Sequence, residues 1–242
     1  MTRLRDRRPG AAHLDLAWRL EELPVPGDAR SLFARPEAPL HLDLGCGAGG
    51  FLAALAARQP ECNFLGVDRL FGRIRSAAFK AKSAHPDNVR LLQADVRAFL
   101  RENLPRHSVS AVYLLFPDPW PKRHHHIRRL FQAELLEICS ILLMPCAPIY
   151  LATDHADYFR HMCATIHARP GTNVGPWPDP DSWPRTEFEA RFLQQGLPVH
   201  RLRITMDAPL MNPVARMESA SEASVIAPCV SCSQTETPEA RS

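Results

Sequence analysis

Three aspartates stand at the ends of short apolar runs, and a glycine-rich turn follows the first of them. Asp43 precedes the turn, while Asp68 and Asp95 end the next two apolar runs. The glycines of the turn are Gly45, Gly47, Gly49 and Gly50. Glycine lets a ligand approach the backbone closely because no Cβ intervenes. The spacing also fits the G-x-G-x-x-G fingerprint of dinucleotide binding, so the glycines alone leave two cofactor classes open.

The acids favour a cationic, phosphate-free cofactor. The carboxylate of Asp43 can pair with an amine, whereas it would repel a pyrophosphate at the same turn. Asp68 is placed to accept hydrogen bonds from both hydroxyls of a ribose, and Asp95 can accept one from an adenine amino group. S-adenosylmethionine meets all three requirements. The alternative is that these acids only cap helices, a frequent role of aspartate.

The fourth apolar run ends in the segment Phe-Pro-Asp118-Pro-Trp120-Pro-Lys122. The prolines on either side of Asp118 restrict the backbone, so they hold its carboxylate in place. Trp120 offers a flat face on which a base can stack. A set of cationic residues suited to phosphate binding follows: Lys122, Arg123, Arg128 and Arg129. A rigid turn beside a solvated basic face is the plainer alternative.

Histidines and cysteines raise the question of a metal, and we predict none. His124 to His126 are consecutive, so their side chains point in different directions, and no acidic or thiol cluster joins them at ligand spacing. Cys229 and Cys232 are closely spaced near the C-terminus, but no second closely spaced pair of cysteines could complete a four-ligand zinc site with them. The odd count of seven cysteines favours reduced thiols over a disulfide framework.

Strands that alternate with helices must position these residues. Apolar runs at 39–45, 62–68, 88–95, 110–116 and 148–154 predict strands, and helical patterns lie at 51–59, 71–84, 96–103 and 128–143. This alternation predicts an α/β fold with a doubly wound, mostly parallel sheet. We also expect a helix over 11–23, a loop over 169–184, a helix over 186–196 and a strand over 198–206.

Length and charge bound the organisation of the chain. A length of 242 residues suits one domain, which we place over 38–212. The residue pattern adds an N-terminal basic and helical extension over 1–37, and the composition of 213–242 predicts a disordered tail. The net charge of +3 requires no polyanionic partner by itself. No apolar run approaches the roughly 20 residues that cross a bilayer, and none follows the basic start. We therefore expect a cytoplasmic protein that contacts no membrane, as a monomer or a homodimer.

The chain resembles the tRNA (guanine-N7-)-methyltransferase family over roughly residues 38 to 206. The most specific match is the string F-P-D-P-W-P-K with the basic, histidine-containing run behind it, and T-D at Thr153-Asp154 and T-E-F-E at Thr186 to Glu189 add to it. The resemblance implies a class I methyltransferase fold with S-adenosylmethionine as cofactor. It also implies tRNA as partner and methylation at N7 of guanine 46, in the variable loop.

Site residues follow from the same resemblance. It implies that Asp118 is catalytic. Implied cofactor contacts are Asp43, Gly45, Gly47, Asp68, Asp95 and Asp118, and implied substrate contacts are Lys122, Asp154, Thr186, Glu187, Phe188 and Glu189. His124 and Ile127 stand where the family usually has basic residues, which removes charge from the expected tRNA-binding run.

Three other functions stay open from the sequence. The first is a class I methyltransferase with a small-molecule or protein acceptor, against which the Pro-Trp-Lys-Arg segment argues. The second is a nicotinamide-dependent oxidoreductase, which Asp43 disfavours. The third is a tRNA-binding protein that has lost catalysis, consistent with the altered basic run.

Overall fold

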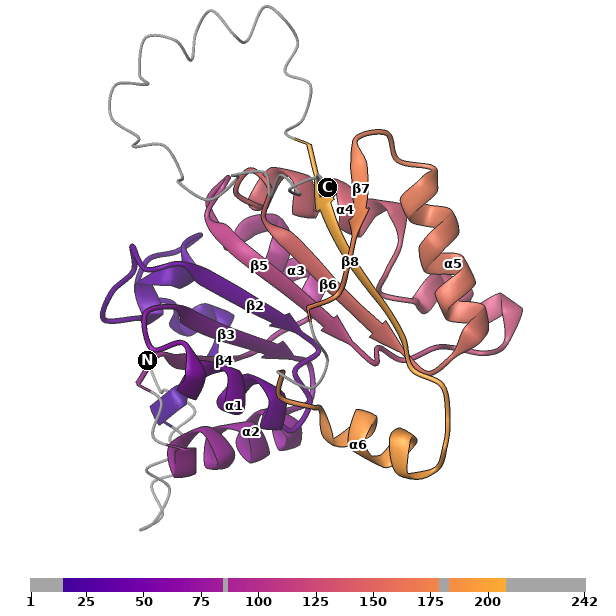
Figure 1. Cartoon of the computed structure of the whole chain (residues 1–242). Helices are drawn as coiled ribbons and strands as arrows, with labels where there is room; N and C mark the ends of the chain where they lie inside the picture. The colour runs from indigo at the N-terminus through magenta and orange to yellow at the C-terminus, as the bar shows by residue number, and fades with distance from the viewer. Residues whose placement is uncertain (1–14, 85–86, 179–182, 208–242) are drawn as a thin grey trace, which may run out of the picture. The chain divides into compact units, whose positions relative to one another are not determined.

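The computed structural model describes residues 15–84, 87–178 and 183–207, which fold around one eight-stranded sheet (Figure 1). The strands are β1 (Ala17–Arg19), β2 (Leu40–Leu44), β3 (Asn63–Asp68), β4 (Val89–Gln93), β5 (Val109–Leu115), β6 (Pro148–Thr153), β7 (Thr172–Gly175) and β8 (His200–Met206). The helices are α1 (Gly50–Arg58), α2 (Phe71–Ala84), α3 (Val96–Glu102), α4 (Ala133–Leu142), α5 (Ala156–His167) and α6 (Glu187–Gln194). Short 3-10 helices lie at Leu20–Glu22, Ala29–Leu32 and Arg123–Arg128.

The strand order is β1-β4-β3-β2-β5-β6-β8-β7. Strands β1 to β6 pair in parallel, whereas β8 runs antiparallel to β6 and β7 antiparallel to β8. The order of connection reverses between β2 and β5, which are hydrogen-bonded neighbours. Ligands of doubly wound sheets bind at such a reversal, beyond the carboxyl ends of the strands. The predicted fold class is confirmed.

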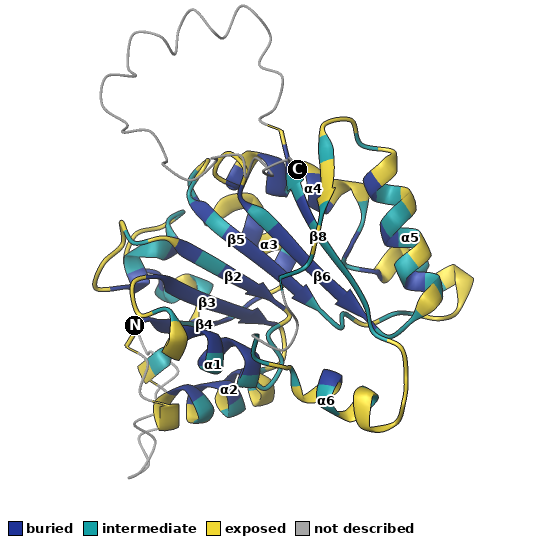
Figure 2. Ribbon diagram, in the orientation of Figure 1, coloured by how far each residue is buried: buried dark blue, intermediate teal, exposed yellow. Residues whose placement is uncertain are grey.

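Apolar side chains cover both faces of the sheet. One core joins buried residues of α1 and α2 to one face, with Phe51, Ile74 and Phe64 among its members. The other joins α3, α4 and α5 to the opposite face, with Phe99 and Tyr158 among its members. Figure 2 shows this pattern as dark blue strands between helices whose outer sides are exposed. Burial on both faces explains why the central strands are almost continuously apolar.

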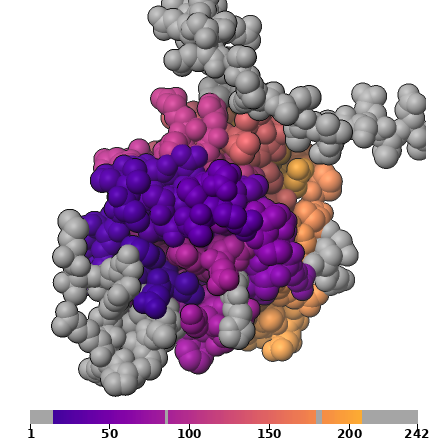
Figure 3. Space-filling view, turned by 90° about the vertical axis from the view of Figure 1, so that its left-hand side faces the viewer, coloured from indigo at the N-terminus to yellow at the C-terminus, as the bar shows by residue number. Residues whose placement is uncertain are grey.

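The predicted helix over 11–23 is wrong within the described residues. Ala17–Arg19 forms β1, which pairs in parallel with β4 through Ala17 and Leu91, and a 3-10 turn follows. Ala17 packs into one core and Trp18 into the other, so successive residues point to opposite faces, as in a strand. The expected extension therefore adds an edge strand to the sheet. Figure 3 shows the N-terminal residues, in indigo, over much of this side of the molecule.

Two further elements differ from the prediction. Thr172–Gly175 forms β7 inside the expected loop, because it pairs with β8 through Thr172 and Met206. The helix expected over 128–143 begins only at Ala133, since Gln132 is extended and the basic run before it forms a 3-10 helix. The expected tail, 213–242, lies outside the described residues. Within the described ranges, no helix has both the length and the apolar character that crossing a membrane requires.

The turn after β2 brings α1 close to α2 at a glycine. Gly49 caps the N-terminus of α1 in the left-handed region, with φ of 71°. A Cβ added to Gly49 would lie 2.4 Å from the Cβ of Ala77 on α2. A methyl group at this position would therefore strain the backbone and also clash with the neighbouring helix.

We predict that Gly49→Ala lowers the free energy of unfolding by about 2–4 kcal/mol, measured by urea denaturation. Gly196→Ala is the matched control, because Gly196 also has a positive φ of 66° but no atom lies within 4 Å of an added Cβ. The control should lose only about 1 kcal/mol from backbone strain. Equal losses of unfolding free energy in the two variants would show that the contact of the added methyl group with Ala77 contributes nothing.

Candidate active site

The glycine turn between β2 and α1 is tied to the next strand by its backbone. The amides of Gly45 and Cys46 both donate to the carbonyl of Val67, at 2.8 and 3.1 Å. The amide of Gly47 donates to Oδ2 of Asp68 at 3.2 Å. Gly45 has φ of 79°, and nothing lies within 4 Å of where its Cβ would be. The turn thus leaves open space beside a fixed backbone.

Two neighbouring hollows occupy the strand ends at the reversal of strand order. The smaller, of about 190 Å³, lies between the glycine turn and the start of α6. The larger, of about 560 Å³, extends toward the ends of β3 and β4 and includes Asp68, Asp95 and Trp120. Both are lined by Gly45, Arg73, Phe116 and Asp118.

All six predicted cofactor residues therefore line one or both of these adjoining hollows. Thr186, Glu187 and Phe188 also line the smaller one, from the start of α6. Lys122, Asp154 and Glu189 do not line either hollow. Arg73 and Phe116 line both, although we did not single them out in the sequence. Only their positions in the sequence could have indicated them. Phe116 ends the apolar run before Asp118, and Arg73 lies in the first turn of the helix that follows Asp68.

Asp43 is almost completely buried at the base of the smaller hollow, with 4% of its surface exposed. Burial, and secondarily the charge of Asp68, raises the pKa of the Asp43 carboxyl to about 7. Among the described residues, no side chain or amide donates a hydrogen bond to this carboxylate. A buried carboxylate without a donor is costly, and a cationic group in the hollow would stabilise its ionised form. The site therefore fits an amine-bearing ligand.

The other two strand-end acids already have backbone partners. Asp68 is buried and accepts from the amides of Gly47 and Leu70, and Nη1 of Arg73 lies 3.5 Å away. Asp95 caps α3, because its Oδ1 accepts from the amides of Arg97 and Ala98 at 3.0 and 3.1 Å. Asp95 therefore does cap a helix, which by itself does not decide whether it also contacts a cofactor. Its Oδ2 has no donor in the described part of the chain, and it borders the larger hollow.

The loop that carries Asp118 has an unusual backbone. Phe116 and Trp120 both have positive φ, 52° and 46°, although neither is glycine. Such strain costs about 1–2 kcal/mol per residue and persists only where the surroundings enforce it. The amide of Phe116 donates to the carbonyl of Ala152 at 2.7 Å, which fixes the loop to β6. Asp118 is exposed between them, and no described residue donates to its carboxylate.

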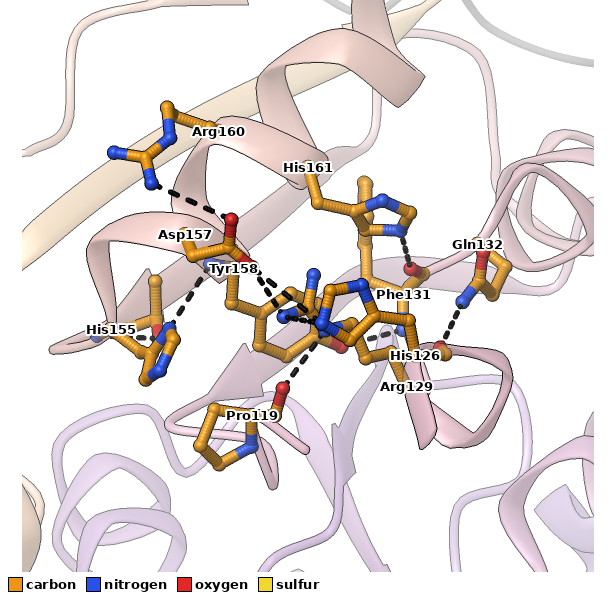
Figure 4. Close-up of polar contacts among 11 residues, drawn as sticks. Pro119, His126, Arg129, Phe131, Gln132, His155, Asp157, Tyr158, Arg160 and His161 are labelled. Atoms are coloured by element: carbon orange, nitrogen blue, oxygen red, sulfur yellow. Dashed lines mark hydrogen bonds and ion pairs between the residues drawn. The ribbon is translucent and has the colours of Figure 1, made fainter. Parts of the chain in front are cut away.

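The expected cationic patch includes one residue fewer than predicted. Lys122, Arg123 and Arg128 are exposed, and the Arg128 guanidinium lies 5.0 Å from the centroid of the Trp120 ring. Arg129 is only 1% exposed, so its predicted contact with phosphate is wrong. Figure 4 shows why, since its guanidinium points inward to Asp157, His126 and the carbonyl of Pro119.

The start of α6 is fixed by its cap and by two ion pairs. Oγ1 of Thr186 accepts from the amide of Glu189 at 3.0 Å, which confirms the predicted N-cap. The Glu189 side chain is buried and pairs with Arg201 of β8 instead of closing a capping box. Glu187 pairs with Lys80 of α2. Phe188 is 45% exposed and lines the smaller hollow, while the Arg191 guanidinium lies 5.2 Å from the centroid of its ring.

Metal ligands are not grouped in the described ranges, where no three His, Cys, Asp or Glu side chains could hold an ion together. The three consecutive histidines have separate surroundings. The rings of His124 and His125 lie edge to face with centroids 4.1 Å apart, and Nε2 of His126 lies 3.8 Å from Oδ2 of Asp157.

A further hollow of about 470 Å³ lies at the opposite ends of the strands, with Ala34, Asn63 and Asn88 among its lining residues. The Asn88 amide donates to the carbonyls of Ala56, Gln59 and Cys62. This side chain is already fully engaged in holding the local backbone together.

Comparisons with known proteins agree with this geometry. A protein family described as "Putative methyltransferase" matches residues 37–202. The chain is 39% identical over 180 residues to the tRNA (guanine-N(7)-)-methyltransferase of Halorhodospira halophila, covering 72% of this chain and 78% of that protein. It is 36% identical over 199 residues to the enzyme of the same name from Prochlorococcus marinus strain MIT 9303, covering 78% and 84%.

Solved structures show the same fold at low sequence identity. The 16S rRNA (adenine(1408)-N(1))-methyltransferase from Catenulisporales acidiphilia aligns with a TM-score of 0.50 and 20% identity, over 74% of this chain and 91% of that one. The antibiotic-resistance methyltransferase Kmr aligns with a TM-score of 0.50 and 18% identity, over 72% and 89%. The fold, the strand-end hollow and the similar sequences lead to one conclusion: the chain belongs to the tRNA (guanine-N7-)-methyltransferase family of S-adenosylmethionine-dependent class I methyltransferases.

Proposed function

We propose that this protein transfers the methyl group of S-adenosylmethionine to N7 of guanine 46 in the variable loop of tRNA. The observation that carries the proposal is the pair of adjoining hollows at the reversal of strand order. Asp43, whose buried carboxylate has no hydrogen-bond donor among the described residues, lines the smaller hollow, and the exposed Asp118 lines both. The relatives named as tRNA (guanine-N(7)-)-methyltransferases support the same substrate. This substrate also implies a cytoplasmic location.

The cofactor would lie along both hollows. Asp43 would pair with its amino group, and the turn at Gly45 and Gly47 would let its chain approach the backbone. Asp68 and Asp95 would accept hydrogen bonds from the ribose and the adenine, since each carboxylate oxygen has more than one acceptor site. When bound, the cofactor would supply a methyl group attached to a positively charged sulfonium sulfur.

Asp118 would act on the guanine by position and charge. Guanine N7 has an in-plane lone pair and carries no proton, so no general base is required. Asp118 would accept hydrogen bonds from the N1–H and the exocyclic amino group, which orients the ring. Its negative charge would also offset the positive charge that develops on the purine during transfer. The strained, proline-flanked backbone keeps the carboxylate from turning away.

The tRNA would be held from two sides of this carboxylate. Lys122, with Arg123 and Arg128, provides cations for phosphates, and Phe188 provides a ring for stacking. Asp154 follows β6, beside the Asp118 loop. Thr186, Glu187 and Glu189 remain proposed substrate residues, although Glu189 is paired with Arg201 and would act through the placement of α6.

The direct test is methyl transfer from radiolabelled S-adenosylmethionine to unmodified tRNA that carries guanine or adenine at position 46. We expect label only on the guanine form, with strand cleavage at that position under N7-specific chemistry. Label at another position would correct the target. Cofactor binding without label on either RNA would favour a binding protein or a different acceptor.

We predict that Asp118→Asn lowers kcat by about 100-fold, because the uncharged amide no longer offsets charge on the ring. The Kd for the cofactor should stay within about threefold, since Asp43 and the glycine turn provide its main contacts. Single-turnover kinetics and calorimetry measure the two quantities. Asp87→Asn, at an exposed aspartate before β4, should leave both unchanged. Wild-type turnover in Asp118→Asn would remove Asp118 from the mechanism.

We predict that cofactor binding at pH 6 releases close to one proton. The Asp43 carboxyl, with its pKa of about 7, is mostly protonated in the free protein at this pH, and an amine bound beside it favours the ionised form. Calorimetry in buffers of different ionisation enthalpy measures the release. Asp95→Asn should retain it, whereas Asp43→Asn should abolish it. No proton release in the wild type would contradict the pairing of Asp43 with the amine.

A further inference from the structure

Arg129 is the largest side chain buried completely in the described chain, and its guanidinium has several partners from different elements. Nε donates to the carbonyl of Pro119 at 2.8 Å, and Nη2 donates to Oδ2 of Asp157 at 2.6 Å. Nη2 also lies 3.0 Å from Nε2 of His126. The guanidinium lies 4.8 Å from the centroid of the Tyr158 ring (Figure 4).

Two of these partners, Pro119 and Asp157, lie beside proposed site residues on different elements. Pro119 directly follows Asp118 in the loop after β5. Asp157 lies in the first turn of α5, three residues after Asp154 in the loop after β6. Arg129 is therefore a direct bridge between the Asp118 loop and the element that begins beside Asp154.

Further hydrogen bonds hold the backbone of Arg129 and of the residues after it. The carbonyl of Arg129 accepts from Nη2 of Arg97 on α3 at 2.7 Å. The hydroxyl of Tyr158 accepts from the amide of Phe131, and Nε2 of His161 lies 3.0 Å from the carbonyl of Phe131. A buried guanidinium in so many directed contacts has little freedom to move.

The Asp118 loop needs an external support of this kind. Phe116 and Trp120 have positive φ, and the prolines at 117 and 119 have no amide hydrogen with which to fasten the loop. The carbonyl of Pro119 is an acceptor at the centre of this strained segment, and Arg129 donates to it. Loss of that donor would allow the strained backbone to relax and the Asp118 carboxylate to move with it.

We propose that Arg129 is a positioning residue for methyl transfer: its buried guanidinium sets the place of the Asp118 carboxylate relative to Asp154 by bridging Pro119 and Asp157. The inference rests on the proposed function for its kinetic consequence, but the geometric consequence is independent of any substrate. Arg129 touches neither hollow and acts through Asp118.

The first test compares Arg129→Met with Arg169→Met in single-turnover methyl transfer to tRNA, at a temperature where circular dichroism shows both folded. Arg169 is the matched control, because it is largely buried and pairs with Glu137 but contacts neither loop. We expect the rate of Arg129→Met to fall by about 30-fold or more, with the Kd for the cofactor within about threefold. Arg169→Met should stay within about twofold of the wild-type rate.

The second test separates positioning from general structural support. If Arg129 acts through Asp118, then Arg129→Met should lower the rate of an Asp118→Asn protein by less than about threefold. A double variant whose rate loss equals the product of the losses in Arg129→Met and Asp118→Asn would overturn the proposal.

Hydrogen exchange tests the geometry without any substrate. We expect the peptide covering residues 114–122 to exchange faster in Arg129→Lys and Asp157→Asn than in the wild type, and at the wild-type rate in Arg169→Met. These two milder variants also serve if Arg129→Met does not fold. Unchanged exchange in both would overturn the proposal. A wild-type protein that labels no tRNA but shows this exchange pattern would instead contradict the proposed function alone.

Discussion

The pairing of β2 with β5 is the constraint on which the site depends. These strands are adjacent in the sheet but far apart in the chain, with β3 and β4 on one side and β6 on the other. The chain leaves β2 toward one face, where α1 and α2 pack, and it leaves β5 toward α4 on the opposite face. The loops after β2 and β5 therefore diverge and leave the hollow between them. The glycine turn and the Asp118 loop border it for this reason.

Two aspartates, one at the end of β2 and one in the loop after β5, have opposite surroundings and correspondingly different proposed roles. Asp43 is enclosed, which raises its pKa and makes a cation favourable beside it. Asp118 is exposed on a strained loop that restricts its direction, which suits a group that must meet a large substrate. In the proposed function, an aspartate would thus meet a small cationic cofactor at one strand end and a nucleobase at the next. The cost of the strained loop is offset by contacts behind it, above all those of Arg129.

Much of this arrangement follows from the sequence by simple rules. The five central strands and the positions of Asp43, Asp68, Asp95 and Asp118 could be predicted, because parallel strands with helical crossovers bring their carboxyl ends to one edge. The N-cap role of Thr186 also followed from its type and position. The start of the chain could not be predicted, since β1 is so short that its apolar residues fit a helix as well as a strand. Its identity is decided by pairing with β4, which is a tertiary contact.

The direction in which Arg129 points was equally inaccessible from the sequence. In a run of basic residues, exposure is the reasonable expectation, and only the placement of Asp157 and Tyr158 on α5 makes an inward arginine stable. The same holds for Glu189, whose partner Arg201 comes from a strand twelve residues later. Both cases concern charged side chains that are paired across elements, and sequence spacing contains no signal of such a partner.

In the proposed mechanism, Asp118 accepts hydrogen bonds from the N1–H and the amino group of the guanine while N7 attacks the methyl group. The most direct test of this mechanism is the methylation rate of tRNA with guanine or inosine at position 46, measured for the wild type and for Asp118→Asn. Inosine lacks the amino group but retains N7. We expect the wild type to prefer guanine by about tenfold or more and Asp118→Asn to lose most of this preference. An equal preference in the two proteins would contradict it.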